Sequence, residues 1–165
     1  MGLIGGVAVI LPATLGDIDT LAALRVAMLG EEEPETTPAA MEEVRLQTVE
    51  YLLESLTAAD VLAWVAVQDE EAVGMVILSL FRLPPNTWCP QGNTGYVSGL
   101  YVRPECRRRG IARALMDTLL AQANAAGCQR LLLHATSQGR ALYESLGFRP
   151  SADTMAAYMD CPAAR

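Results

Sequence analysis

The chain has 165 residues, of which 52% are hydrophobic and 19% are charged, and its formal net charge is -7. This balance is too apolar for a disordered chain and is typical of a soluble globular protein, and the length suits one domain. The four cysteines lie far apart without a CxxC pair, so their spacing favours free thiols over a zinc site or a disulfide framework.

The N-terminal stretch MGLIGGVAVILPATLG is apolar, but it lacks the signals of a leader or a membrane anchor. No basic residue precedes Arg25, and Pro12 with several glycines would interrupt a spanning helix. Position 6, where a myristoylation signal carries Ser or Thr, holds a glycine. We therefore expect a cytoplasmic protein in which residues 1–6 form a flexible extension and residues 7–165 form a single domain.

The start of that domain predicts a strand followed by two helices. Residues 7–11 are rich in β-formers and stop at Pro12, and Asp17 can cap the helix that follows. Apolar residues of this helix lie on neighbouring rows, at Ile18, Leu21, Leu24 and Met28. Residues 30–38 contain four glutamates and two prolines, so we expect an exposed loop there, before a second helix over residues 39–56.

The middle of the chain predicts three strands. Apolar runs at residues 62–67 and 73–81 are separated by QDEEA, whose acidic side chains suit a turn, so we expect an antiparallel hairpin. Prolines, glycines and asparagines in residues 82–95 indicate a loop. Residues 96–102 then form a strand that Pro104 ends.

A change of period marks the C-terminal part. From Ile111 onward apolar residues recur every four positions, which predicts a helix that ends near Gly127. The elements expected after it are a short buried strand over residues 130–135, a helix over 138–147 and a last strand over 154–160. The segment from residue 96 to residue 135 has the length of a right-handed crossover between parallel strands.

The stretch RPECRRRGIA, residues 103–112, predicts an anion site. A helix that begins at Gly110 leaves its first N–H groups without intrahelical acceptors, and the helix dipole adds to their attraction for an anion. Gly110 and Ala112 have side chains small enough for a bulky oxyanion to approach. Positive charge around the site comes from three consecutive arginines, Arg107, Arg108 and Arg109. We expect a pyrophosphate held mainly by backbone.

Other interpretations of this stretch are weaker. The chain has neither GxxxxGK[ST] nor a GxGxxG after its first strand, which excludes a P-loop and a dinucleotide fingerprint. A nucleic-acid groove would need more positive charge and aromatic residues among the basic ones. A basic helix start that binds no anion is the alternative that stays open.

The pattern R-x-x-G-x-A, filled by Arg107, Gly110 and Ala112 directly after VRPE, resembles motif A of the GNAT N-acetyltransferases, which is usually Q/R-x-x-G-x-G/A. VAVILPATLGD is similar to the family's opening strand and helix start, and RALYESLGF at residues 140–148 is similar to its late A-x-x-LYxxxGF segment. The resemblance implies an α/β (mixed α+β) GNAT-like acyltransferase fold, in which helices flank a central mixed, mostly antiparallel sheet.

The same resemblance implies that acetyl-CoA is the co-substrate. Its pyrophosphate would lie on the loop from Arg107 to Ala112, which includes Ile111. Its pantetheine arm would run beside the preceding strand and contact backbone groups at Leu100, Tyr101 and Val102. Gly99, inside that strand, agrees with this expectation because a glycine there commonly marks a bulge or a close approach of another chain.

The family's chemistry is direct attack of an amine on the thioester, with the oxyanion stabilised by a backbone N–H, here near Leu100. Tyr143 is the predicted general acid that protonates the departing thiolate, and packing against the core is its alternative role. Thr136 stands where many members have an asparagine, so we predict a cofactor contact with shorter reach.

The general base is left open between water and a glutamate of the acidic loop, which contains Glu31, Glu32, Glu33 and Glu35. That loop is otherwise a solvated face. His134, the only histidine, is expected to be a hydrogen-bonded structural residue at the end of a buried strand rather than a base. We expect Trp64 in the core and Trp88 in the wall of an acceptor pocket.

The sequence therefore predicts an acetyl-CoA-dependent N-acetyltransferase that acts on a small-molecule or peptide amine. The alternative is a non-catalytic acyl-CoA-binding regulatory module. We expect no metal, nucleic-acid or membrane partner, and the sequence leaves open whether the chain forms a homodimer.

Overall fold

The computed structural model describes residues 6–151 and residue 157. The chain divides into two compact units, with the boundary between His134 and Ala135. The predicted last strand over residues 154–160, except residue 157, and the predicted extension over residues 1–6, except residue 6, lie outside the described residues. The division into an extension and one domain over residues 7–165 stays a prediction.

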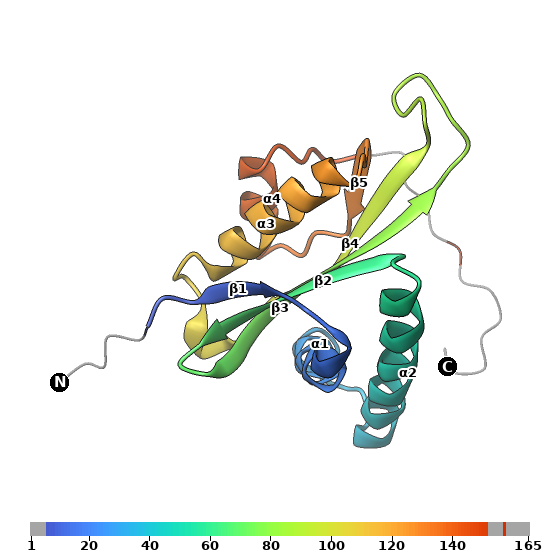
Figure 1. Cartoon of the computed structure of the whole chain (residues 1–165). Coiled ribbons are helices and arrows are strands. Elements are labelled where there is room, and N and C mark those ends of the chain that lie inside the picture. The colour runs from blue at the N-terminus through green and yellow to red at the C-terminus, as the bar shows by residue number, and fades with distance from the viewer. Residues whose placement is uncertain (1–5, 152–156, 158–165) are drawn as a thin grey trace. The chain divides into compact units, whose positions relative to one another are not determined.

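Among the described residues, a five-stranded sheet forms the centre of the first unit, with its strands in chain order (Figure 1). The strands are β1 (Val9–Pro12), β2 (Val61–Gln68), β3 (Glu71–Arg82), β4 (Asn93–Val102) and β5 (Arg130–Leu133). The pairs from β1 to β4 are antiparallel, and β5 runs parallel to β4. The predicted mixed, mostly antiparallel sheet and the predicted crossover are both confirmed.

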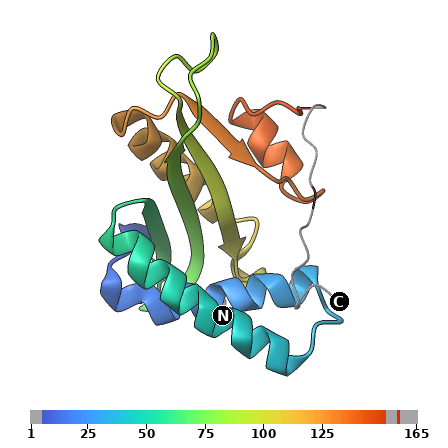
Figure 2. The same ribbon diagram turned by 90° about the vertical axis from the view of Figure 1, so that its right-hand side faces the viewer.

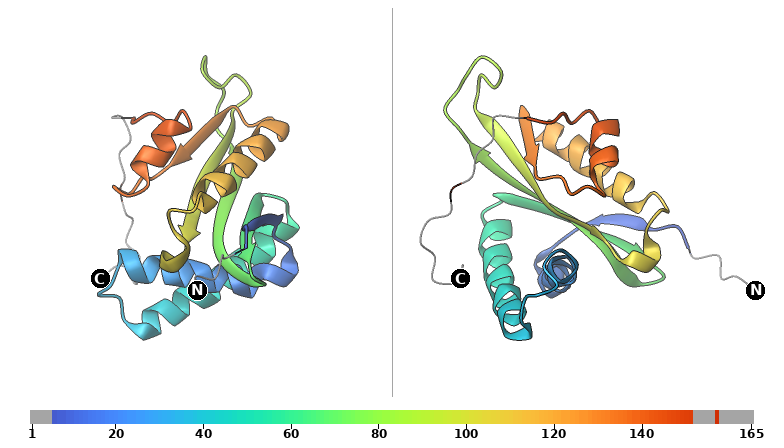
Figure 3. Two further views of the ribbon diagram at one scale, coloured as in Figure 1. Left: turned by 90° about the vertical axis from the view of Figure 1, so that its left-hand side faces the viewer. Right: turned by 180° about the vertical axis from the view of Figure 1, so that it is seen from behind.

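Helices cover both faces of this sheet. Helices α1 (Ile18–Glu32) and α2 (Pro38–Thr57) lie on one face and α3 (Ile111–Ala125) lies on the other, as Figures 1 and 3 show. The core between the sheet and α1 and α2 contains Leu21, Leu24, Leu52, Val61, Ala63, Val65, Met75, Ile77 and Tyr101. On α3 the predicted four-residue spacing is confirmed, because its buried residues include Ile111, Leu115, Leu119 and Ala123.

The hairpin between β2 and β3 follows from its turn residues. Asp69 and Glu70 both have positive φ, 51° and 66°, as a two-residue turn needs when it matches the twist of its strands. Aspartate adopts this conformation more readily than most residues because its short side chain bonds to nearby backbone. The acidic segment therefore forms the turn that the sequence predicted.

The start of α1 differs in detail from the prediction. Asp17 makes no side-chain cap for α1, but closes a capping box with Thr14 around a 3-10 turn, Leu15–Asp17. The Thr14 N–H donates to Asp17 Oδ2 over 2.8 Å. The predicted order of a strand followed by a helix is thus confirmed, with one short 3-10 turn between β1 and α1.

Three predictions about bounds and burial differ from the structure. The loop expected over residues 30–38 begins later, because α1 continues through Glu32. The strand expected to be buried at residues 130–135 is β5, whose burial is only partial because it lies at the edge of the described sheet. In addition, β4 begins at Asn93, three residues before its predicted start, which shortens the preceding loop to residues 83–92.

The second unit contains α4 (Arg140–Ser145), which confirms the helix predicted over residues 138–147 with shorter bounds. Gly147 follows it with φ of 91°, the left-handed conformation that commonly ends a helix. Over the part of the chain that the structure describes, no helix combines the length and apolar character that crossing a membrane requires.

Candidate functional site

A bulge interrupts β4 at Gly99 and Leu100. Met75 pairs with Tyr101, whereas Ile77 pairs with Ser98, so β4 carries one residue more than β3 between these pairs. Gly99 has φ of 69°, a conformation that favours glycine. A bulge, one of the two features that the sequence predicted at Gly99, is therefore present.

The edge of β4 that faces β5 is paired only at its beginning. The parallel pairing runs from Thr94 with Arg130 to Val97 with Leu133 and stops there. Within the first unit, no described strand pairs with Ser98–Val102 on that side. The strand thus presents backbone groups along an open edge, directly after the bulge and directly before the loop 103–110.

The alternation of backbone directions decides which groups face that edge. The Arg103 N–H donates to Val73 O over 2.8 Å, so Arg103 faces β3, and Tyr101, two residues earlier, faces the same way. Val102 then faces the open edge, where its carbonyl accepts from Arg107 Nε over 2.8 Å. Of the three predicted pantetheine contacts, Val102 is the one whose backbone the register turns toward the open edge, and the contact of Leu100, which lies in the bulge, stays a prediction.

The start of α3 forms a concave row of backbone N–H groups. Those of Arg108 to Ala112 donate to no acceptor among the described residues. Arg108 and Gly110 both have positive φ, 61° and 80°, and left-handed residues within such a loop turn successive N–H groups toward a common point. This arrangement suits an anion held mainly by backbone, and the predicted pyrophosphate site stays a prediction.

The glycine at the start of α3 has a conformational reason beside the expected one, which stays a prediction. A Cβ at Gly110 would meet no atom within 4 Å, so the protein leaves space there. Gly110 has φ of 80°, and a residue with a side chain would be strained in that conformation. Arg108 carries a similar strain although it has a side chain, a feature that occurs more often at functional sites than elsewhere.

The three arginines do not have the same surroundings. Arg108 and Arg109 are exposed and have no acidic partner among the described residues. Arg107 instead places its Nη2 2.7 Å and 3.0 Å from the two carboxylate oxygens of Glu31, and its guanidinium lies 5.6 Å from the centre of the Tyr101 ring. Two arginine side chains, not three, are available to an anion at the start of α3.

The contacts of Glu31 change its acidity and that of Tyr101. Hydrogen bonds, first from Arg107 and then from the Tyr101 hydroxyl, lower the pKa of Glu31. Burial, followed by the hydrogen bond to Glu31, raises the pKa of Tyr101 to about 12. A carboxylate held in its ionised form by two donors is a weak base, so Glu31 is a poor choice among the glutamates that the sequence offered.

His134 does not have the buried position that the sequence predicted. It is exposed, directly after β5, and its Nδ1 is hydrogen-bonded to the hydroxyl of Tyr96 on β4. The two rings are 5.8 Å apart between centroids and inclined by 59°. Sequence analysis missed Tyr96, although the predicted parallel crossover brings the strand of residue 96 beside the strand that precedes His134.

The two tryptophans lie in different environments. Trp64 is 5% exposed, which confirms its place in the core. Trp88 is 90% exposed and lies in the loop 83–92, which precedes β4, whereas the anion loop follows β4 (Figure 2). Ten residues of strand separate the two loops, roughly 30 Å at ~3.3 Å per residue. The role of Trp88 in the wall of an acceptor pocket stays a prediction.

The second unit contains two further predicted site residues. Thr136 Oγ1 accepts from the Gly139 N–H over 3.3 Å, so this hydroxyl stabilises the turn before α4. Tyr143 is half-buried, and the edge of its ring contacts Phe148 with centroids 5.9 Å apart. The cofactor role of Thr136 and the acid role of Tyr143 stay predictions.

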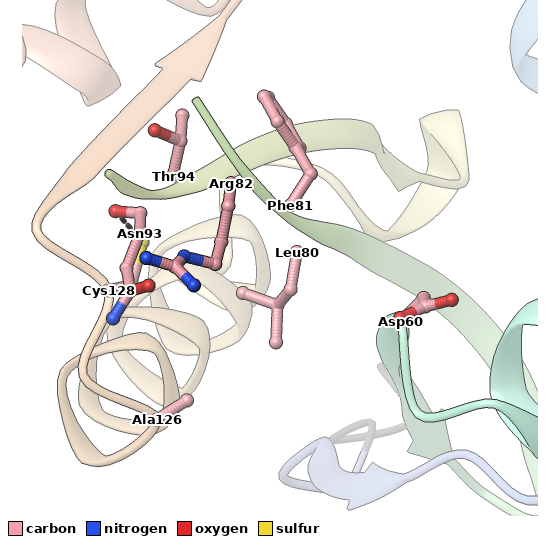
Figure 4. Close-up of a pocket in the computed structure, with 8 residues that line it drawn as sticks. All are labelled: Asp60, Leu80, Phe81, Arg82, Asn93, Thr94, Ala126 and Cys128. Atoms are coloured by element: carbon pink, nitrogen blue, oxygen red, sulfur yellow. Dashed lines mark hydrogen bonds between the residues drawn. The ribbon is translucent and has the colours of Figure 1, made fainter. Parts of the chain in front are cut away.

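A pocket of about 330 Å³ lies at the other end of β4 from the anion loop (Figure 4). Its lining residues are Asp60, Leu80, Phe81, Arg82, Asn93, Thr94, Ala126 and Cys128. None of the predicted cofactor residues is among them. The pocket is therefore separate from the site formed by β4 and α3.

Comparisons with known proteins agree with this arrangement. The model of the acetyltransferase (GNAT) family matches residues 26–148. A predicted acetyltransferase with acetyl-CoA from Clostridium acetobutylicum has a TM-score of 0.83 at 22% identity, over 92% of this chain and 96% of that chain. A GCN5-related N-acetyltransferase from Ralstonia eutropha has a TM-score of 0.81 at 26% identity, over 92% and 99% of the two chains.

A third similar structure is the aminoglycoside N-acetyltransferase AAC(6')-Iy in complex with CoA. Its TM-score is 0.71 at 18% identity, over 98% of this chain and 99% of that chain. No curated protein sequence matches the chain significantly.

Proposed function

Because the chain belongs to the acetyltransferase (GNAT) family, we propose that it transfers an acetyl group from acetyl-CoA to an amine. The observation that carries the proposal is the row of N–H groups from Arg108 to Ala112, which have no acceptor among the described residues and follow directly on the open edge of β4. A row of N–H groups that can bind an anion suits the pyrophosphate of CoA. An unpaired strand edge suits its pantetheine arm. The similar proteins with acetyl-CoA and with CoA support the same choice of donor.

The pyrophosphate would be held by the N–H groups at the start of α3, with Arg108 and Arg109 adding charge. The pantetheine arm would lie along the open edge of β4 and bond to the backbone of Leu100 and Val102. The bulge at Gly99 would then bring the Leu100 N–H to the thioester carbonyl. This donor would stabilise the oxyanion that forms when the amine attacks.

In the transfer, the amine nitrogen forms a bond to the thioester carbon and loses one N–H proton to a base, and the C–S bond breaks with its electron pair on sulfur. The products are an N-acetylated amine and CoA, whose thiolate takes up one proton. We propose Tyr143 as the donor of that proton, since a phenol and a thiol have ordinary pKa values of about 10 and about 8.5. No covalent intermediate on the protein is needed.

The test has two stages, both on the tag-free full chain. Calorimetry first measures binding of acetyl-CoA, and release of CoA thiol is then followed with aminoglycosides, polyamines, and peptides that offer either an α-amine or a lysine. Because an α-amine has a lower pKa than lysine, about 7.7–8.0 against about 10.4, it needs less help from a base at neutral pH. Transfer to any amine supports the proposal, and failure to bind acetyl-CoA contradicts it.

The alternative is a regulatory module that binds acyl-CoA without turning it over. It has one supporting feature in the sequence, because Thr136 replaces the asparagine that many members carry. Binding of acetyl-CoA with no thiol release across the whole amine panel would favour the regulatory module.

A further inference from the structure

We propose that His134 is the general base of the transfer and that Tyr96 is the residue that positions it. The inference rests on the proposed acetyltransferase function and adds to it the group that takes the proton from the amine. It starts from one contact, the hydrogen bond between the Tyr96 hydroxyl and His134 Nδ1.

The register of the sheet places this pair next to the bulge. Leu133 pairs with Val97, so His134, the next residue, lies at the level of Ser98, immediately before Gly99. The Leu100 N–H that would bind the oxyanion is two residues beyond Ser98 along β4. This is a rise of roughly 7 Å at ~3.3 Å per residue, and His134 lies one interstrand spacing of about 4.8 Å to the side. An imidazole at this level lies within reach of an amine that attacks the thioester.

The face of the sheet on which Tyr96 and His134 lie also agrees with the proposal. Tyr96 pairs with Ser79, whose Oγ is hydrogen-bonded to Tyr51 of α2 over 2.9 Å, so Tyr96 lies on the face that α1 and α2 cover. Tyr96 pairs with Leu132 on its other side, and His134 follows Leu132 by two residues, which returns its side chain to the same face. Helix α3, which begins the anion site, lies on the opposite face. Donor and acceptor would therefore approach the open edge of β4 from opposite sides.

His134 has the accessibility that a base requires. Its side chain is exposed, and its ring makes one hydrogen bond to the described residues, through Nδ1. Glu31, a carboxylate that the sequence offered as a base, is occupied by Arg107 and Tyr101. Between Asn93 and Val102 the sequence of β4 itself contains no carboxylate.

The proposal requires that Nδ1–H is the donor in this hydrogen bond. When Nδ1–H donates to the Tyr96 oxygen, Nε2 keeps a free lone pair and can accept a proton from the attacking amine. In the step, the amine N–H bond breaks, the proton moves to Nε2, the N–C bond to the acetyl group forms, and the thiolate leaves with the C–S electron pair. The imidazolium afterwards returns its proton to solvent, and its Nδ1–H donates to Tyr96 throughout.

The activity test uses His134→Gln, His134→Ala and Tyr96→Phe, with Tyr51→Phe as the matched control on the same face. His134→Gln should lower kcat by about 10²–10⁴-fold, the usual contribution of a general base, with an acetyl-CoA affinity within about twofold of the wild type. Added imidazole should restore part of the rate to His134→Ala but none to the wild type. Tyr96→Phe should lower kcat less, and Tyr51→Phe should leave it unchanged.

Nitrogen-15 NMR reads the tautomer without any turnover. Because the chain has one histidine, the tag-free protein gives a single pair of imidazole nitrogen signals. At a pH where the ring is neutral, the proton should reside on Nδ1 in the wild type and shift toward Nε2 in Tyr96→Phe. A wild-type ring with its proton on Nε2 would overturn the proposal, since that nitrogen could then not accept.

The two proposals fail in different ways. If the wild type binds no acetyl-CoA, the acetyltransferase function itself is wrong. If the wild type transfers acetyl groups and His134→Gln does so at the same rate, the function stands and His134 is not its base. If His134→Gln loses activity together with acetyl-CoA affinity, and imidazole restores nothing, the residue is structural and the inference is again wrong.

Discussion

Glu31 and Arg107 form an ion pair that joins the last turn of α1 to the loop after β4. Arg107 Nη2 lies 2.7 Å from Glu31 Oε2 and 3.0 Å from Glu31 Oε1, while Arg107 Nε donates to Val102 O. One side chain thus connects a helix, the end of a strand and the anion loop. We infer that the pair holds the loop in the conformation that exposes its N–H groups.

This pair predicts a specific dependence of stability on pH. Because the pKa of Glu31 is lowered from its ordinary 4.5, the stabilisation is complete above pH 4.5 and is lost as the pH falls through the lowered value. Glu31→Gln should reduce the free energy of unfolding at pH 7 by up to about 1 kcal/mol, since the carboxylate is partly exposed. Chemical denaturation at pH 7 and pH 3 measures the difference, which should shrink at pH 3.

Glu32→Gln is the matched control for this prediction. Glu32 is exposed in the same turn of α1 and has no partner among the described residues. It should show no change at either pH. Equal losses in both variants would mean that the effect comes from the helix end and not from Arg107.

The start of α3 predicts that backbone matters more than charge for binding acetyl-CoA. Gly110→Val should strain a position with φ of 80° and disturb the row of N–H groups, lowering the affinity more than tenfold. Arg108→Gln removes one exposed charge and should lower it by no more than a few-fold. Isothermal titration calorimetry gives both values, and a larger loss for Arg108→Gln would show that charge dominates.

Gly30→Ala controls for the general effect of replacing an exposed glycine. Gly30 lies inside α1, and a Cβ there would meet no atom within 4 Å. Its replacement should leave acetyl-CoA affinity unchanged. An affinity loss comparable to that of Gly110→Val would mean that the effect is not specific to the loop at the start of α3.

Because of the bulge, we predict that any side chain at position 99 lowers the free energy of unfolding. A Cβ there would lie 3.3 Å from Met75 Cε and would occupy a backbone with φ of 69°. Gly99→Ala should therefore destabilise the fold by about 1–2 kcal/mol, a fall in Tm of about 3–6 °C. Thermal unfolding measures it, and Gly16→Ala, which makes only an ordinary contact with Thr14, should not move Tm.

Replacement of Tyr143 should change the rate of transfer without changing the affinity for acetyl-CoA. If its hydroxyl protonates the leaving thiolate, Tyr143→Phe should lower kcat by about 10²-fold or more while the Kd of acetyl-CoA stays nearly constant. Steady-state kinetics with calorimetry on the same preparation tests this. An unchanged kcat would leave Tyr143 a structural role, which includes the packing against Phe148.

Much of the local structure was predictable because it depends on neighbours in the sequence. The apolar spacing from Ile111 predicted α3, the acidic pair Asp69 and Glu70 lies in the predicted turn, and Gly99 marks the predicted bulge. R-x-x-G-x-A likewise predicted the loop whose N–H groups point outward. In each case the conformation follows from the φ preferences and side-chain periodicity of a few adjacent residues.

Contacts between distant segments could not be predicted in this way. Glu31 is 70 residues from Tyr101 and 76 from Arg107, so no local pattern links them. The sequence placed Glu31 in an exposed loop and grouped Arg107 with two free arginines, and both expectations changed once α1 packed beside β4. His134 similarly acquired its partner Tyr96 only through the pairing of β4 with β5.

The sequence by itself therefore determined the backbone of this site: the bulge at Gly99, the strand before the loop, and the helix start at Gly110. The tertiary structure alone decided the state of its charged and ionisable side chains, by neutralising Arg107 with Glu31, leaving Arg108 and Arg109 free of acidic partners among the described residues, and joining Tyr96 to His134. The physical reason is the distance over which each kind of interaction acts. Backbone preferences act over a few residues of chain, whereas ion pairs and hydrogen bonds between side chains depend on distances in space that only the packed fold defines.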